Sequence, residues 1–96
     1  MEIKVETKSI FYGIMVYWEK VTDAACYTVN LYTKKQKWKI ATIVVERNMC
    51  YYTFKDLGIQ EYLIEVEAEN REGHLIAQSK LVDCEPNRYV YTGLLK

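Results

Sequence analysis

Residues 62–69 read Tyr-Leu-Ile-Glu-Val-Glu-Ala-Glu, and apolar side chains alternate with polar ones along most of this stretch. A period of two predicts a β-strand with Tyr62, Ile64, Val66 and Ala68 on one face and the glutamates on the other. We therefore expect one face in the core and the other in water. Residues 70–73, Asn-Arg-Glu-Gly, are typical of a hairpin turn, and a last strand is predicted over 75–82.

The same alternation recurs toward the N-terminus, where turn residues separate the apolar runs. It predicts strands over residues 3–12, with a break near Thr7 and Lys8, and over 14–19, 27–32, 38–45 and 50–54. Gly13 is expected to let the chain turn or bulge between the first two. No stretch has sustained helical periodicity, so the chain is predicted to be all-β, with the seven strands of an immunoglobulin-like sandwich.

The spacing of the apolar residues resembles the fibronectin type III family over residues 3–84. The resemblance rests on Trp18, on Tyr27 and Val29, on Tyr52, Phe54 and Leu57, and on residues 62–73 followed by Ser79. It implies a seven-stranded fibronectin type III sandwich with Trp18 and Tyr27 in the core and Leu57 capping it. It also implies that Tyr62 forms a tyrosine corner, with its hydroxyl bonded to nearby backbone. We predict one domain over 1–84 and a C-terminal extension over 85–96.

Composition excludes several classes of function. Lys plus Arg and Asp plus Glu both number 13, so no net field favours binding to nucleic acid. The apolar stretches are short, which predicts neither a signal peptide nor membrane insertion. The resemblance likewise implies a domain for binding or spacing, with no catalytic residues.

Chemically reactive residues are few. The three cysteines, Cys26, Cys50 and Cys84, are expected to be reduced thiols, with Cys50 facing the core and reacting slowest. His74 is the only histidine, so we expect no metal site, no cofactor and no enzymatic activity. The glutamates of residues 62–69 are interpreted as a solvated face, partly matched by Lys37 and Lys39.

Apolar residues outside the predicted core are the main indication of function. In a type III sandwich the first, second and fifth strands share a sheet, and Met15, Tyr17 and Tyr51 should lie together on its outer face. The extension adds Tyr89, Tyr91 and Leu94. We predict that these six residues bind another protein, either a different chain or a second copy. The extension should add to a sheet edge or cover the Met15, Tyr17 and Tyr51 patch.

The favoured hypothesis is a small non-enzymatic interaction module, a structural subunit or adaptor of a larger bacterial or phage assembly. The absence of an export signal predicts a cytoplasmic or virion-associated setting. One alternative is a carbohydrate- or cell-surface-binding module of a secreted multidomain protein. The other is a small inhibitor of a single partner enzyme. The genes that neighbour this one would distinguish them best.

Overall fold

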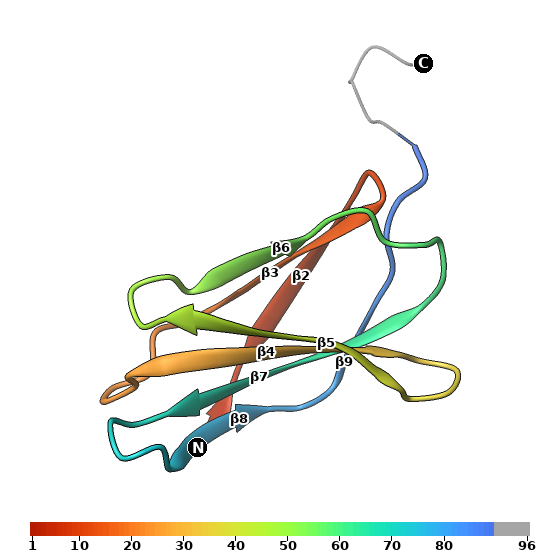
Figure 1. Ribbon diagram of the computed structural model, residues 1–96. Helices are drawn as coiled ribbons and strands as arrows, with labels where there is room; N and C mark the ends of the chain where they lie inside the picture. The colour runs from red at the N-terminus through yellow and green to blue at the C-terminus, as the bar shows by residue number, and fades with distance from the viewer. Residues whose placement is uncertain (90–96) are drawn as a thin grey trace.

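The computed structural model describes residues 1–89, which form a sandwich of two β-sheets (Figure 1). The larger sheet has the order β1 (Glu2–Ile3), β8 (Leu75–Ser79), β7 (Tyr62–Glu69), β4 (Cys26–Thr33) and β5 (Lys39–Glu46), and β9 (Val82–Cys84) also pairs with β7. The smaller sheet has the order β2 (Val5–Ile10), β3 (Gly13–Trp18) and β6 (Tyr51–Phe54). The all-β sandwich is confirmed, as is the predicted pairing of the first, second and fifth strands. No helix in the described part of the chain could span a membrane.

The first predicted strand is broken at Lys4 and not near Thr7 and Lys8, where the prediction was wrong. Ile3 is buried and pairs in parallel with Ser79 of the larger sheet, whereas Val5 pairs with Trp18 of the smaller one. The chain therefore crosses from one sheet to the other at Lys4. Thr7 and Lys8 lie within an unbroken ladder.

The last predicted strand is also split, because Ser79 interrupts its ladder. The Ser79 hydroxyl accepts the Val66 N–H at 2.9 Å, which replaces a backbone partner, and donates to the Lys80 carbonyl at 2.8 Å. The chain pairs with β7 again from Val82 to Cys84. The seven predicted strands thus correspond to nine segments, because the first and the last are each divided.

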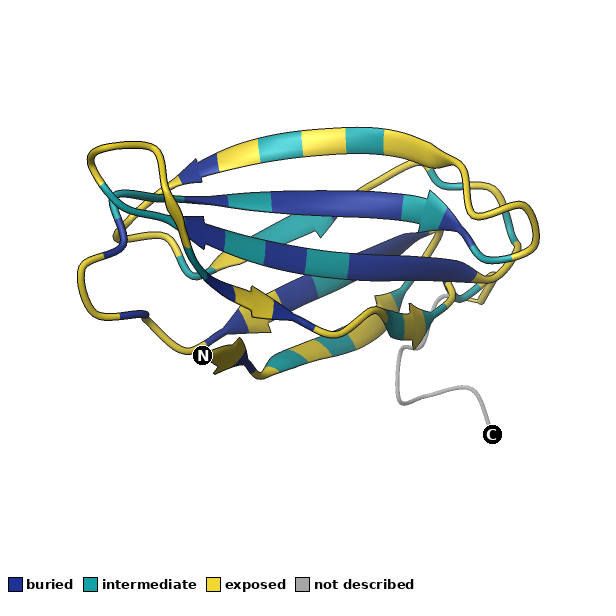
Figure 2. Ribbon diagram, turned by 90° about the horizontal axis from the view of Figure 1, so that it is seen from below, coloured by how far each residue is buried: buried dark blue, intermediate teal, exposed yellow. Residues whose placement is uncertain are grey.

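The apolar strand faces predicted from the alternation of apolar and polar residues lie in the core. Trp18 is 6% exposed and its ring meets the fully buried Tyr27 edge to face, with centroids 5.3 Å apart. Leu57 is half-buried and packs against this cluster. Figure 2 shows that β4 and β7 are largely buried, whereas β5 is mostly exposed or half-buried, with only Val45 buried. The central strands β4 and β7 of the larger sheet therefore contribute a large part of the core.

The tyrosine corner predicted at Tyr62 is present. Tyr62 is 2% exposed, and its hydroxyl donates to the Gly58 carbonyl at 2.8 Å across the loop that joins β6 to β7. A similar bond holds the β3–β4 connection, where the Tyr27 hydroxyl accepts the Val21 N–H at 2.8 Å. Both aromatic rings thus fasten a loop to the core.

Two turns differ in how they use glycine. In the β7–β8 hairpin Gly73 has φ 83°, and its N–H donates to the Asn70 carbonyl at 3.0 Å, as the turn sequence predicted. Between β2 and β3, Tyr12 takes the left-handed conformation with φ 50°. Gly13 is needed there because a Cβ would lie 2.5 Å from the Phe54 carbonyl oxygen, so its role is close approach and not a turn.

Candidate functional site

The outer side of the smaller sheet carries the predicted patch of Met15, Tyr17 and Tyr51, which we call the aromatic face. Tyr17 and Tyr51 are directly opposite each other on β3 and β6 and are 38% and 54% exposed. Met15, which pairs with Thr53, is half-buried. The register therefore brings the three side chains onto neighbouring positions of one sheet surface. Such a row of aromatic residues on rigid strands is suited to contact with a protein.

The aromatic face has a polar border. On β2, Glu6 lies opposite Tyr17 and Lys8 lies opposite Met15. Both are exposed. An apolar centre with charged residues at the margin is the usual arrangement of a protein interface.

The beginning of the C-terminal extension lies along the end of β2. The Asn87 N–H donates to the Ile10 carbonyl at 2.9 Å, and the Tyr12 N–H donates to the Asn87 carbonyl at 2.7 Å. Phe11 and Asn87 thereby form a parallel bridge. Tyr89 is 71% exposed. Tyr91 and Leu94 lie outside the described residues.

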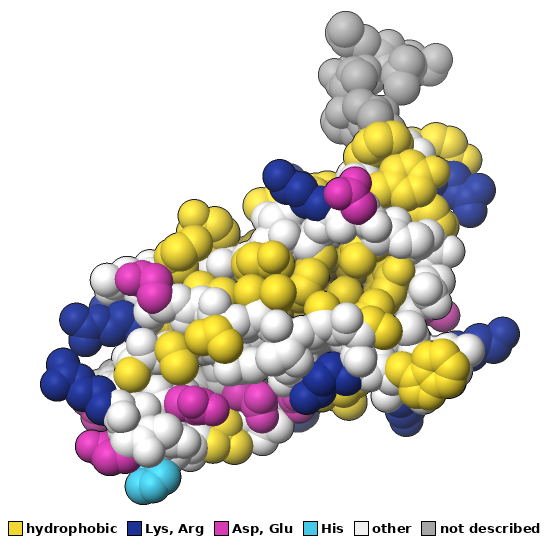
Figure 3. All heavy atoms as spheres, in the orientation of Figure 1, with side chains coloured by type: hydrophobic (Ala, Val, Ile, Leu, Met, Phe, Trp, Pro, Cys, Tyr) yellow, Lys and Arg dark blue, Asp and Glu magenta, His cyan; other side chains and the backbone are white. Residues whose placement is uncertain are grey.

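Two exposed aromatic residues were missed in the sequence. Phe11 and Tyr12 were assigned to the first strand, but they form the β2–β3 turn, are 53% and 39% exposed and pack edge to face with centroids 4.7 Å apart. Figure 3 shows hydrophobic side chains gathered at this end of the sandwich. The left-handed residue of this turn is Tyr12 and not Gly13, so the glycine did not mark its position.

The glutamate face is organised differently from the prediction. Asn30 occupies an outward position of β4, yet it is 1% exposed, and its Nδ2 donates to Glu65 at 3.1 Å and Glu67 at 3.0 Å. Its Oδ1 accepts from the Thr42 hydroxyl at 3.0 Å. Every polar atom of this buried amide is thus used, and the two carboxylates are held at fixed positions on the sheet.

Within residues 1–89 no lysine forms an ion pair with these carboxylates, which corrects the match to Lys37 and Lys39. The Tyr32 hydroxyl donates to Glu65 at 3.0 Å, and Gln78 donates to its second oxygen at 3.0 Å. Burial, followed by the bond to Glu65, raises the pKa of Tyr32. Lys39 instead lies over the Tyr32 ring, 5.8 Å from its centroid.

An open depression of about 710 Å³ lies where the β3–β4, β5–β6 and β7–β8 connections meet. Its lining includes Lys20, Arg47 and Arg71 together with Asp23 and Glu72, and it contains no aromatic side chain. The mixture of charges could accommodate polar groups of a partner. It offers no stacking platform for a sugar ring.

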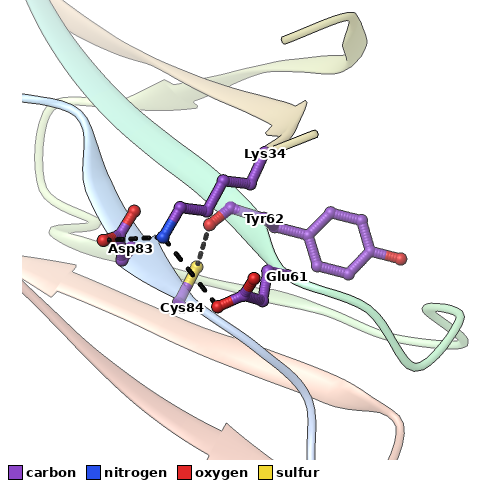
Figure 4. A network of polar contacts seen from close by, with 5 residues as sticks. All are labelled: Lys34, Glu61, Tyr62, Asp83 and Cys84. Atoms are coloured by element: carbon purple, nitrogen blue, oxygen red, sulfur yellow. Dashed lines mark hydrogen bonds and ion pairs between the residues drawn. The ribbon is translucent and has the colours of Figure 1, made fainter. Parts of the chain in front are cut away.

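The thiols do not form a reactive centre. Burial, and then the charge of Asp83, raise the pKa of Cys84 to about 12, and its Sγ donates to the Tyr62 carbonyl at 3.7 Å (Figure 4). Nearby, Lys34 pairs with Asp83 at 3.2 Å and with Glu61 at 3.9 Å (Figure 4). A protonated thiol is a poor nucleophile, so Cys84, and not Cys50, is expected to react slowest.

The remaining chemistry is sparse. The three cysteines are unpaired and half-buried, and His74 is exposed in the β7–β8 turn. Within residues 1–89, no group of three or more His, Cys, Asp or Glu side chains could hold a metal ion.

Solved structures support the fold. The FN1–FN3 domains of chicken CNTN1 share 15% identity with this chain at a TM-score of 0.76, and the match covers 90% of this chain and 30% of that one. A myokine structure shares 19% identity at a TM-score of 0.72, with coverage of 88% and 95%. A β-1,2-glucanase from Parabacteroides distasonis shares 18% identity at 0.70, and the match covers 94% of this chain but only 12% of the enzyme. The type III resemblance is thus confirmed for the fold.

Sequence comparison assigns the family. No curated protein matches the sequence. The family model described as "Immunity protein 15" matches residues 3–92, which is nearly the whole chain and includes the start of the extension. The chain therefore belongs to the immunity protein 15 family.

Proposed function

We propose that this protein is an immunity protein that binds a single protein toxin and neutralises it. The observation that carries the proposal is the family match across residues 3–92. This function corresponds to the small-inhibitor alternative of the sequence analysis. An inhibitor of this kind acts by occupying its partner, so it needs a contact surface and no catalytic group of its own.

The aromatic face is the proposed toxin-binding surface. Tyr17 and Tyr51 are held by the β3–β6 ladder, so little conformational entropy is lost when a partner covers them. Tyrosine is enriched among the residues that dominate binding energy. The charged border of Glu6 and Lys8 would then set the orientation of the partner.

Stoichiometric inhibition also agrees with the chemistry of the chain. The Cys84 thiol is protonated at neutral pH, because its pKa is raised to about 12. The carboxylates of Glu65 and Glu67 accept hydrogen bonds from the same buried amide, which supports a structural role for both. We infer that one copy of the protein blocks one toxin. We further propose a cytoplasmic location, where unpaired cysteines stay reduced.

The other two hypotheses are weaker. A structural or adaptor subunit is supported only by the type III fold, which hosts many unrelated functions. A carbohydrate-binding module has no aromatic platform in the depression at the loop end. Neither is retained as a second candidate.

The test is co-expression with the toxic polypeptide encoded beside this gene. We expect the wild-type chain to restore growth and to purify with the toxin in equal amounts. The double variant Tyr17→Ala/Tyr51→Ala should lose at least about 2 kcal/mol of binding energy, roughly a thirty-fold weaker Kd. Its melting temperature should change little, because both side chains are exposed.

The matched control removes two exposed leucines elsewhere. Leu75 and Leu81 are 52% and 49% exposed, and Leu75→Ala/Leu81→Ala should leave toxin binding unchanged. If the tyrosine variant binds as tightly as this control, the aromatic face is not the toxin-binding surface. If the wild-type chain neither protects nor binds, the immunity function itself is wrong.

A further inference from the structure

Strand β5 forms an edge of the larger sheet. Within residues 1–89 it pairs with β4 alone, and it is eight residues long (Figure 1). Its centre, residues 40–45, reads Ile-Ala-Thr-Ile-Val-Val and has no charge and no proline. Natural edge strands are usually protected by a central charge, by proline, by shortness or by a bulge. Among the described pairs of β5 the one irregularity is at its first end, where the register passes from Leu31–Ala41 to Tyr32–Lys39 and leaves Ile40 without a partner on β4; residues 41–46 pair regularly and carry no such protection.

The outer side chains of this edge are apolar and exposed. Ile40 and Val44 are 49% and 68% exposed and lie on either side of Thr42, and Trp38, just before the strand, is 65% exposed. Isolated apolar side chains are common on surfaces. A row of them beside free backbone hydrogen-bonding groups, in a charge-free and mostly β-branched segment, favours pairing with another strand.

The outward side chains of β5 match those of a second β5 strand that runs in the opposite direction. Its outer face reads Ile40, Thr42, Val44, so an antiparallel copy centred on Thr42 presents an apolar residue to each apolar residue. The charges within the strand also reverse, because Lys39 is its first residue and Glu46 is its last. Lys37 and Arg47 both lie outside the strand, in the flanking turns.

We propose that β5 pairs with β5 of a second copy of this chain, antiparallel about a two-fold axis at Thr42. Outward residues must face outward residues in a continuous sheet, so Ile40 lies opposite Val44 of the second copy and Thr42 lies opposite its own equivalent. The basic end of each strand then lies beside Glu46 of the other. The arrangement is closed, because the same edge is used on both copies.

This dimer does not depend on the proposed function. It joins the two larger sheets, whereas the aromatic face belongs to the smaller sheet. Each dimer therefore keeps two aromatic faces, one for each copy.

The test is a charge exchange across the proposed pair, measured by sedimentation equilibrium of the full chain up to about 1 mM, which detects dimers with a Kd in that range or tighter. Ile40→Glu and Val44→Lys should each weaken the dimer about ten-fold, because each substitution occurs twice in the symmetric pair. The double variant Ile40→Glu/Val44→Lys should recover most of the loss, since each new glutamate faces a new lysine. Leu75→Lys, a similarly exposed position on β8, should dimerise like the wild type.

Thermal melts of the four variants separate association from folding, since all the substituted residues are exposed and the monomer should remain folded. A wild-type chain that stays monomeric at about 1 mM overturns the proposal, and β5 would then be an edge for a strand of a different protein. A double variant as monomeric as the single ones also overturns it, because the recovery requires this register.

Discussion

Tyr62→Phe tests whether the tyrosine corner stabilises the fold. The substitution removes one hydroxyl from a side chain that is 2% exposed and breaks its 2.8 Å bond to the Gly58 carbonyl. A buried polar group left without a partner costs about 1 to 3 kcal/mol. Because Gly58 itself is exposed, water can reach its carbonyl, and we expect the lower part of that range, about 1 to 2 kcal/mol. For a domain of this size the melting temperature should fall by roughly 5 to 15 °C.

The assay is urea and thermal unfolding followed by circular dichroism, with two further tyrosines for comparison. Tyr51→Phe is the matched control, since Tyr51 is 54% exposed, and its cost should be near zero. Tyr27→Phe should cost more than Tyr62→Phe, because it leaves the Val21 N–H without its partner next to a fully buried ring. If Tyr62→Phe is as stable as Tyr51→Phe, the corner bond contributes nothing and the reasoning is wrong.

Three other predictions follow from the described contacts. Trp18→Ala should lower the free energy of unfolding by about 3 to 5 kcal/mol, because it leaves a void between the sheets. Trp18→Phe should lower it much less, because the indole N–H has no partner among the described residues. Urea unfolding of both variants measures the two changes. Burial raises the pKa of the Cys84 thiol from 9.0 to about 12, so its contribution to the free energy of unfolding should be complete below pH 9 and lost as the pH rises toward 12. Unfolding of Cys84→Ala, measured across the same pH range, should lack this contribution. In the native protein the Cys84 thiol should also be the slowest of the three to react. Deleting residues 87–96 removes the bonds of Asn87 to Ile10 and Tyr12, so the melting temperature should fall, and an unchanged melting temperature and oligomeric mass would show that the extension has no structural role.

Local alternation predicted most strands and their buried faces, because it depends only on neighbours in the chain. Strand β7 was predicted over its full length, and Trp18, Tyr27 and Tyr62 lie in the core as expected. The tyrosine corner was implied by the type III resemblance, and it could be assigned to Tyr62 because its bond spans only four residues. The exposed positions of Tyr17 and Tyr51 followed from the same period of two.

The pairing of residues far apart in the sequence could not be predicted from local alternation. The crossing at Lys4 exists because Ile3 pairs with Ser79, far away in the sequence. Asn30 occupies an outward position of its strand, yet side chains from two neighbouring strands cover it and bond it. A polar residue at an outward position looks solvated until those neighbours are known.

The amino-acid sequence by itself determined the all-β class, the core face of the strongly alternating strands such as β7 and the absence of a charge imbalance, because these depend on composition and on a period of two. Only the tertiary structure decided which strands are edges, and hence that the uncharged centre of β5 has a partner strand on one side alone within residues 1–89. Edges are a property of topology: the same six residues at the centre of a sheet would have both sides paired and no exposed apolar row. The tertiary structure likewise joined Tyr17 to Tyr51, two residues that lie on different strands and become neighbours only when β3 pairs with β6.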